Sequence, residues 1–221
     1  MTTPVRPALT RDRVLEGALA LADEIGMERF TIRRLAERLG TKPMSIYHHV
    51  PSKEEIIDGM VDRVFAEIAL PPEELEWQEA LRMRCDSARD VLRRHPWAPP
   101  LMESRTRPGP ASLRHHDAML ATLRRGGLSW EVTAHGYAIL DSFVYGFALE
   151  EASLPGGGGS EMTDMADELA EVFADYPTLA AFTSDWVLRP GYSFGASFEF
   201  GLDLIVEGLA RAGAKTDRSR E

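Results

Sequence analysis

The stretch that decides the fold runs from Thr31 to Lys53: Thr31-Ile-Arg-Arg-Leu-Ala-Glu-Arg-Leu-Gly40, then Thr41-Lys-Pro-Met-Ser-Ile-Tyr-His-His-Val50-Pro-Ser-Lys53. Its first part places apolar residues at positions i, i+3, i+4 and i+7, namely Ile32, Leu35, Ala36 and Leu39. This spacing predicts a helix with one buried face. Gly40 is then expected to end that helix, because glycine tolerates a left-handed backbone.

A second, shorter helix is expected after this turn. Thr41 can cap it, and Pro43 falls in its first turn, where a missing N–H costs little. Ile46 and Val50 are its expected interior residues, which leaves the outer face to Lys42, Met44, Ser45, Tyr47, His48 and His49. Such a helix-turn-helix is how many proteins enter the DNA major groove. The alternative is an ordinary surface helix of a helical bundle.

Length and composition describe an ordinary soluble chain. It has 221 residues, of which 44% are hydrophobic and 27% charged. The single cysteine, Cys85, excludes an internal disulfide framework and a Cys-based zinc site within one chain, and it fits a reducing compartment. The N-terminus resembles no secretion signal and no stretch reaches the roughly 20 apolar residues of a membrane span. We therefore expect a cytoplasmic protein without a membrane partner.

The charge is unevenly distributed along the chain. The formal net charge is −10, which at first argues against a nucleic-acid partner. Residues 1–50, however, carry eight Arg and Lys against six Asp and Glu, a net of +2, so the remainder carries −12. A slightly basic head on an acidic body suits a protein that touches phosphates at one end only.

The rest of the chain also predicts helices. Thr10 precedes an amphipathic segment that ends at Gly26, and Ser52-Lys-Glu-Glu55 matches a capping box before a helix over 52–68. We expect an all-α protein with a three-helix DNA-binding head (1–52), a connector helix (53–72), a helical-bundle body for ligand binding and dimerisation (73–213) and a flexible tail (214–221). The expected body helices span about 75–94, 97–105, 110–125, 129–152, 162–174 and 193–212, and residues 155–160, Pro-Gly-Gly-Gly-Gly-Ser, are expected to form a loop.

Three stretches of the head resemble the TetR family of bacterial transcription regulators. They are 18–26 (Ala-Leu-Ala-Leu-Ala-Asp-Glu-Ile-Gly), 30–40 (Phe-Thr-Ile-Arg-Arg-Leu-Ala-Glu-Arg-Leu-Gly) and 45–56 (Ser-Ile-Tyr-His-His-Val-Pro-Ser-Lys-Glu-Glu-Ile). The body is similar to the tetracycline-repressor-type C-terminal domain in 94–97 (Arg-His-Pro-Trp) and 198–209 (Phe-Glu-Phe-Gly-Leu-Asp-Leu-Ile-Val-Glu-Gly-Leu).

The resemblance implies a homodimer that places two recognition helices in adjacent major grooves and leaves the DNA when a small molecule enters the body. It implies that the DNA-binding residues are Arg33, Thr41, Lys42, Pro43, Met44, Ser45, Tyr47, His48, His49 and Lys53. In this set Lys53 and Arg33 would take phosphates, and the Arg33 guanidinium could instead read a guanine edge. Pro43-Met44 departs from the family pattern, so the base read by each residue stays open.

The body contains candidate pocket and interface residues. Trp97, Met102, His116, Met119, Tyr137, Asp141, Phe143, Phe147 and Trp186 are the candidates for an effector pocket, with bulk core as the alternative. Phe194, Phe198, Gly201, Leu202, Ile205 and Leu209 form one stripe that the resemblance assigns to the dimer interface, with packing inside one chain as the alternative.

Together these features favour a ligand-responsive DNA-binding repressor that needs no cofactor or metal. Adjacent histidines on a helix diverge by about 100°, so His48-His49 and His115-His116 do not suit a shared metal ion. Two rivals stay open. One is a helical enzyme, although the sequence has no phosphate loop, nucleophile elbow or His-Glu-x-x-His motif. The other is a ligand-binding or scaffold protein with a vestigial head.

Overall fold

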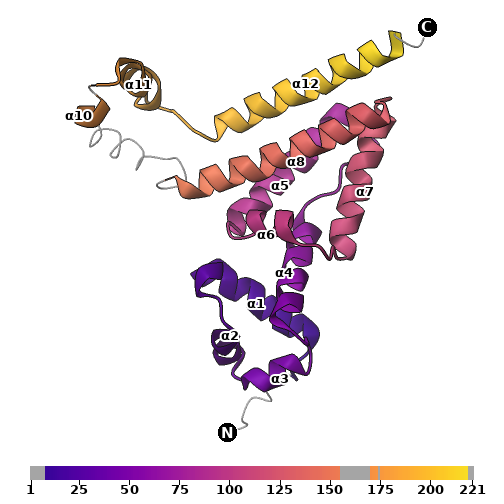
Figure 1. Ribbon diagram of the computed structural model, residues 1–221, viewed down its shortest axis with the longest axis vertical. Helices are drawn as coiled ribbons and strands as arrows, with labels where there is room; N and C mark the ends of the chain where they lie inside the picture. The colour runs from indigo at the N-terminus through magenta and orange to yellow at the C-terminus, as the bar shows by residue number, and fades with distance from the viewer. Residues whose placement is uncertain (1–7, 155–169, 174, 219–221) are drawn as a thin grey trace.

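The computed structural model describes residues 8–154, 170–173 and 175–218, and these residues form helices and connecting turns without a β-strand. The all-α prediction is therefore confirmed. The chain forms a small head at one end, a helical body at the other, and one helix that joins them (Figure 1).

The head contains α1 (Arg11–Ile25), a 3-10 turn (Met27–Arg29), α2 (Ile32–Leu39) and α3 (Pro43–Tyr47). The Thr10 and Thr31 hydroxyls cap α1 and α2, each accepting a backbone N–H at 3.2 Å. Gly40 ends α2 with a left-handed φ of 59°, as its position in the sequence predicts. The helix-turn-helix therefore follows from local signals in the stretch 31–53.

Helix α4 (Lys53–Glu67) leads from the head into the body (Figure 1). Ser52 caps it by accepting the Glu55 N–H at 3.1 Å. Gly59 lies where α1 crosses, since a Cβ there would lie 2.7 Å from Leu15. On its other side α4 packs against α7, so the same helix contacts both head and body, whose buried apolar residues form one continuous core.

The body contains α5 (Trp77–Arg94), α6 (Pro99–Ser104), α7 (Pro110–Arg125), α8 (Trp130–Ser153) and α12 (Ala196–Arg218). Helix α8 packs against α5, α6, α7 and α12, and α8 and α12 lie side by side at the end away from the head (Figure 1). Among the described residues, no helix combines the length and apolarity that crossing a membrane requires.

An arm of short helices stands beyond one end of α8 (Figure 1). It contains α10 (Ala170–Phe173), α11 (Pro177–Phe182) and a π-helical turn (Thr183–Val187), and neither α11 nor this turn was predicted. Of the predicted helix 162–174, residues 170–173 are helical, whereas 162–169 and the predicted loop 155–160 lie outside the described residues.

The predicted flexible tail is wrong over residues 214–218, because α12 continues to Arg218. We expected Gly213 to stop the helix. Instead its missing side chain lets α12 approach Leu128, whose Cδ2 would lie 2.5 Å from a Cβ at this position. Ala214 and Lys215 favour the helical state, so nothing in this stretch ends the helix.

The predicted interface stripe on α12 faces the interior of its own chain. Phe198, Leu202 and Leu209 are buried, and the Phe143 ring would lie 2.7 Å from a Cβ at Gly201. Phe194 stacks on Phe147, and Ile205 packs against the same core. The assignment of Phe198, Leu202 and Leu209 to a dimer interface is corrected accordingly, since the alternative, packing within one chain, describes them. Phe194, Gly201 and Ile205 are partly exposed.

We predict that Phe198→Ala lowers the free energy of unfolding by about 3–5 kcal/mol, because it empties a fully buried aromatic site. Phe198 stacks on Phe143 at 5.2 Å between ring centroids. Leu113→Ala, at an exposed position on α7, is the control and should change stability by less than about 0.5 kcal/mol. Denaturant unfolding at one protein concentration measures both, and equal effects of the two substitutions would contradict the packing described.

Candidate nucleic-acid interface and body cavity

Helix α3 is anchored on one side and open on the other. Ile46 and Val50 are fully buried, whereas Lys42, Pro43, Met44, His48 and His49 are exposed. Thr41, Ser45 and Tyr47 are partly exposed at the rim of this surface. Figure 1 shows α3 at the tip of the head, farthest from the body. The outward residues expected from the sequence thus form one surface.

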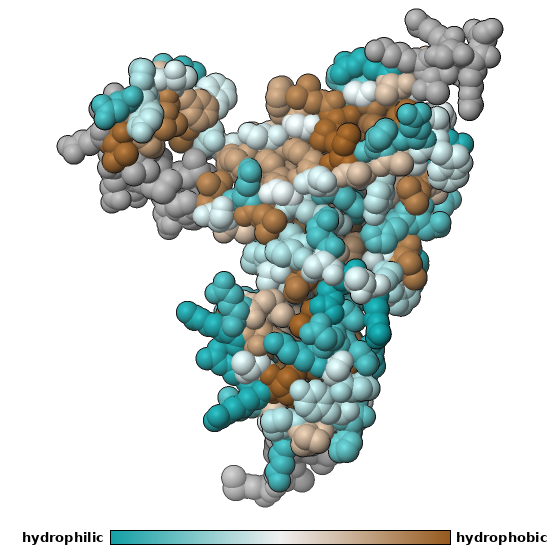
Figure 2. Space-filling model, viewed as in Figure 1, coloured by the Kyte–Doolittle hydropathy of each residue, from teal (hydrophilic) through white to brown (hydrophobic). Residues whose placement is uncertain are grey.

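Cationic side chains flank this surface. Arg33 on α2 has an 85% exposed side chain, and its one ion pair, with Glu37 at 3.0 Å, is also exposed. Lys53 begins α4, with its Nζ 5.9 Å from the centre of the Phe30 ring. Figure 2 shows hydrophilic side chains over much of the head, whereas apolar patches gather over the far end of the body and the arm. An exposed ion pair contributes little to stability, so Arg33 is free to exchange its partner.

A small cavity of about 130 Å³ lies between α4, α6 and α7. Its walls are both apolar and charged, and include Asp58, Asp62, Phe65, Met102, Arg105 and His116. Two of the predicted pocket residues, Met102 and His116, are among the lining residues. The cavity therefore touches the connector helix directly.

The loop between α6 and α7 is fastened to α4 at this cavity. Asp62 Oδ1 accepts the backbone N–H groups of Ala111 and Ser112, both at 2.9 Å, and so caps α7 from another helix. Gly109 permits this approach, because a Cβ there would lie 2.3 Å from the Asp62 carboxyl carbon. Arg105 donates to Asp58 at 2.6 Å and to Glu54 at 2.7 Å. Any displacement of the loop must therefore act on α4.

A chain of polar side chains leads from the cavity into the body. The hydroxyl of Ser112 lies 3.1 Å from Nε2 of His116, whose Nδ1 is hydrogen-bonded to the Tyr137 hydroxyl. Burial raises the pKa of Tyr137, and the nearby carboxylate of Asp141 raises it further. Tyr137 and Asp141, both predicted as pocket residues from the sequence, thus do not line the cavity themselves but are connected to it through His116.

Arg84 is a buried cation that the sequence analysis missed. Its Nη1 lies 3.5 Å from Oδ1 of Asp141, and neither atom has a hydrogen-bond partner in the structure. Burial alone would lower the pKa of Arg84, but interactions with Cys85, Asp141 and Tyr145 raise it. The helical spacing of Leu81, Arg84, Cys85 and Ala88 could have revealed it, since it puts the arginine on the buried face of α5.

The other predicted pocket residues are dispersed. Met119 is buried in the core, and Phe143 and Phe147 pack against the aromatic rings of α12. Trp97 lies at the junction of head and body, where its indole donates to Asp23. Trp186 is 55% exposed on the arm, in a surface cleft with Arg189, Tyr192 and Phe200. Within the described ranges, no group of three or more His, Cys, Asp or Glu side chains is arranged to hold a metal ion.

Comparison with known families matches both parts of the chain. The family described as "Bacterial regulatory proteins, tetR family" matches residues 14–60. The family described as "Tetracyclin repressor-like, C-terminal domain" matches residues 70–212. The first match contains the helix-turn-helix, and the second contains the buried polar chain and those cavity residues that belong to α6, α7 and the loop between them.

Individual relatives cover nearly the whole chain. An HTH-type transcriptional regulator of Saccharopolyspora erythraea is 31% identical over 208 residues, which cover 93% of this chain and 86% of the relative. The HTH-type transcriptional repressor DrrR1 of Streptomyces coeruleorubidus is 32% identical over 220 residues, 92% of this chain and 78% of the relative. The structure of ActR of Streptomyces coelicolor, solved with actinorhodin, is 32% identical with a TM-score of 0.77, and the alignment covers 94% of this chain and 100% of ActR.

The buried side chain of His115 is expected to make the stability of the fold depend on pH. Its ring lies 5.8 Å from that of Phe65, and its Nδ1 has no hydrogen-bond partner. Burial, reinforced by the charge of Arg84, lowers its pKa from 6.5 to about 4. Below pH 6.5 the unfolded chain therefore binds a proton that the folded chain does not, so stability falls as the pH drops towards 4.

We predict that His115→Gln removes up to about 3 kcal/mol of the pH dependence of the unfolding free energy between pH 6.5 and 4. Exposed His49→Gln is the control and should leave the slope unchanged. Denaturant unfolding at several pH values measures the slope. A slope that survives His115→Gln intact would contradict the assignment of this titration to His115.

Proposed function

The chain belongs to the TetR family of bacterial transcription regulators, and on this premise we propose that it is a repressor that binds a palindromic operator as a homodimer and is released by a small molecule. It is a DNA-binding regulator rather than an enzyme. We further propose that it acts in the cytoplasm, where a bacterial regulator meets its DNA. The observation that carries the proposal is the exposed surface of α3 on a buried anchor of Ile46 and Val50.

In the proposed complex, α3 lies in the major groove. Its side chains suit base edges: Lys42 can donate to guanine, Met44 can contact a thymine methyl, and Ser45 can pair with several edges. Tyr47, Lys53 and Arg33 would bind the phosphate backbone, which sets the register of the helix. Thr41, Pro43, His48 and His49 complete the proposed interface.

We assign the dimer interface to the exposed face of α8 and α12. Large apolar side chains lie open on this face, among them Phe200 at 68% exposure, Ile139, Leu149 and Leu204. Gly146 and Gly208 have open space where a Cβ would be, which permits close approach of another helix. A symmetric dimer through this face would present two heads, as half-sites about 34–36 Å apart require.

The proposed effector site is the cavity between α4, α6 and α7. ActR, similar over nearly all of its length, was solved with actinorhodin, which supports a ligand-binding body. A ligand that fills this cavity of about 130 Å³ would lie directly against the loop that Asp62 and Arg105 fasten to α4. Since α4 carries the head, the occupied state would favour dimers whose recognition helices no longer fit successive grooves.

Operator binding tests the proposed function. A DNase footprint on the DNA upstream of the gene should show a palindrome-sized protected region, and the affinity should fall steeply with salt. Absence of both would overturn the repressor proposal and favour a scaffold or ligand-binding protein. This experiment needs neither the effector nor a variant.

We predict that Tyr47→Ala weakens operator binding by about tenfold or more, because it removes a proposed contact between α3 and the phosphate backbone of the DNA. Tyr176→Ala, at an exposed tyrosine on the arm, should leave the affinity unchanged. Fluorescence anisotropy with a labelled operator measures both, after circular dichroism has shown that each variant is folded. Unchanged affinity of Tyr47→Ala would remove this residue from the interface.

We predict that Leu204→Glu shifts the dimer towards monomers, because it places a charge in the proposed apolar interface. Leu113→Glu, on an exposed position of α7 outside that face, is the matched control and should remain dimeric. Sedimentation analysis over a range of concentrations distinguishes the two. A Leu204→Glu dimer as stable as the control would exclude this face.

A further inference from the structure

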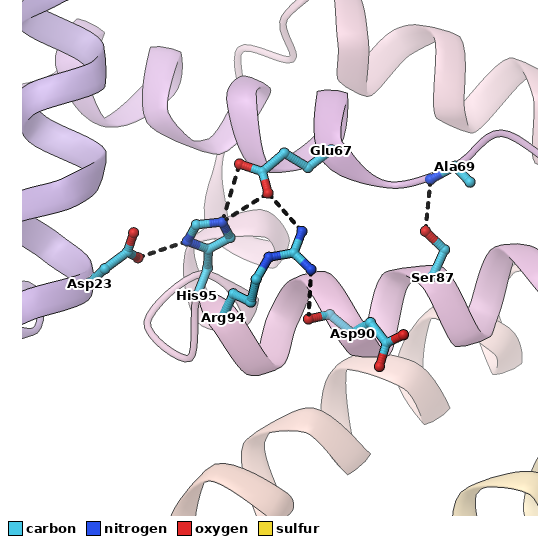
Figure 3. A network of polar contacts seen from close by, with 7 residues as sticks. All are labelled: Asp23, Glu67, Ala69, Ser87, Asp90, Arg94 and His95. Atoms are coloured by element: carbon cyan, nitrogen blue, oxygen red, sulfur yellow. Dashed lines mark hydrogen bonds and ion pairs between the residues drawn. The ribbon is translucent and has the colours of Figure 1, made fainter.

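The head also contacts the body through a polar junction at the far end of α4, away from the contact of Gly59 with Leu15 (Figure 3). Asp23 lies near the end of α1, Glu67 ends α4, and His95 and Trp97 belong to the turn between α5 and α6. Nδ1 of His95 lies 2.7 Å from Oδ1 of Asp23, and the Trp97 indole donates to the same oxygen at 2.7 Å. Nε2 of His95 lies 3.3 Å from the carboxylate of Glu67.

His95 is held between two carboxylates in this junction. His95 is 5% exposed and has a carboxylate opposite each ring nitrogen, Asp23 at Nδ1 and Glu67 at Nε2. A ring N–H on either side therefore has an acceptor. Arg94 also donates to Glu67, at 2.8 Å. Burial alone would raise the pKa of Glu67, but the hydrogen bonds from Arg94 and His95 outweigh it and the pKa is lowered. The turn is thereby fixed to two elements at once.

The same turn continues into the cavity wall. It leads directly into α6 (Pro99–Ser104), whose Met102 lines the cavity. At its other end α6 leads to Arg105, which holds α4 through Asp58 and Glu54. Residues 95–112 therefore form a strap that lines the cavity. Its Arg105 end is bound to α4, and its His95 end is bound both to α1 of the head and to Glu67, the last residue of α4.

We propose that His95 and Trp97 are positioning residues that couple the ligand cavity directly to α1 through Asp23, as a second route beside α4. This proposal rests on the proposed function, since it concerns how the body sets the angle of the DNA-binding head. Movement of α6 shifts the His95–Trp97 turn, and the turn pulls on Asp23. One end of the strap thus holds α1 of the head, and the other end holds the first half of α4, the helix that carries the head.

The junction is not required to hold α1 in place. Helix α1 packs on α4 through buried Val14, Leu15 and Ala18, and Arg63 on α4 donates to Asp12 at 2.9 Å. Loss of the Asp23 contacts should therefore leave a folded head that is less well oriented. This difference separates a positioning role from a merely structural one.

The test measures the angle of the head without DNA or ligand. Spin labels at Glu28→Cys in the head and Leu113→Cys in the body report the distance within one chain, with labelled protein diluted in unlabelled protein. Cys85 should not take up label, because it is buried and burial raises its pKa to about 11. Three substitutions are compared in this background: Asp23→Ala, Asp23→Asn and Glu24→Ala.

Asp23→Ala should broaden the distance distribution and weaken operator binding by about tenfold, a typical size for coupling between sites. Asp23→Asn retains an oxygen that accepts from Trp97 and His95, so it should restore both readouts. Glu24→Ala is the matched control, since it removes an ion pair with Arg38 inside the head. Unchanged distances in Asp23→Ala, or an equal loss in Asp23→Asn, would overturn the proposal.

A substitution inside the cavity tests the coupling to the strap. Met102→Trp fills the cavity as a ligand would, and should shift the head–body distance when Asp23 is present. In the Asp23→Ala background the shift should be smaller, and an equal shift in both backgrounds would overturn the second route. The distances do not require operator binding, so failure of the proposed repressor function would appear separately, as a normal distance response without a footprint.

Discussion

The arrangement of head and body depends on the double burial of α4. Ile56, Met60 and Val64 are each fully buried, and Gly59 lets α1 lie directly against the helix. On the opposite side, Asp62 supplies the cap that α7 cannot obtain from Gly109. A helix packed against both head and body cannot shift against one without disturbing the other, because protein interiors are close-packed. We therefore expect a change in the contacts of α4 with the body to alter its contacts with the head.

The body retains buried polar groups that an apolar core would not require. The Arg84–Asp141 pair is removed from solvent, and both Nη1 of Arg84 and Oδ1 of Asp141 lack hydrogen bonds. Such groups are costly unless partners satisfy them. The hydrogen bonds of His116 with Ser112 and Tyr137 lead from this region to the cavity wall. The arrangement fits a site whose polar groups are kept for a ligand rather than for stability alone.

Local signals predicted the head well, because its information lies within short segments. The period of residues 32–39, the left-handed Gly40 and the caps at Thr10 and Ser52 act over a few residues, and each has its expected role. The predicted cap at Thr41 is wrong, because α3 begins one residue later, with Lys42 at its N-cap position and no side-chain cap. The outer surface of α3 followed from the same pattern. Sequence reasoning could not connect Asp23 with His95, because 72 positions separate them and only the folded chain brings them together.

The interface on α12 shows where such reasoning fails. This helix has apolar residues on two sides, Phe198, Leu202 and Leu209 on one and Phe200 and Leu204 on the other. Periodicity identifies both stripes but does not say which one its own chain covers. Phe198 contacts Phe143 and Phe147 on α8, so the stripe that contains Phe198 is the one that the chain itself covers. Arg84 was missed for a related reason, since a charged residue within a helix is expected at the surface unless its buried neighbours are considered.

The charges of the head suit reversible binding to DNA. Arg33, which belongs to the proposed interface, already holds a carboxylate at the surface, that of Glu37 at 3.0 Å. Exposed pairs of this kind contribute about 0–1 kcal/mol, so breaking one costs little. A phosphate contact gains free energy from the release of counterions, and this gain shrinks as salt rises. Arg33 can therefore exchange the Glu37 carboxylate for a phosphate at small cost, which suits a contact that forms and breaks readily.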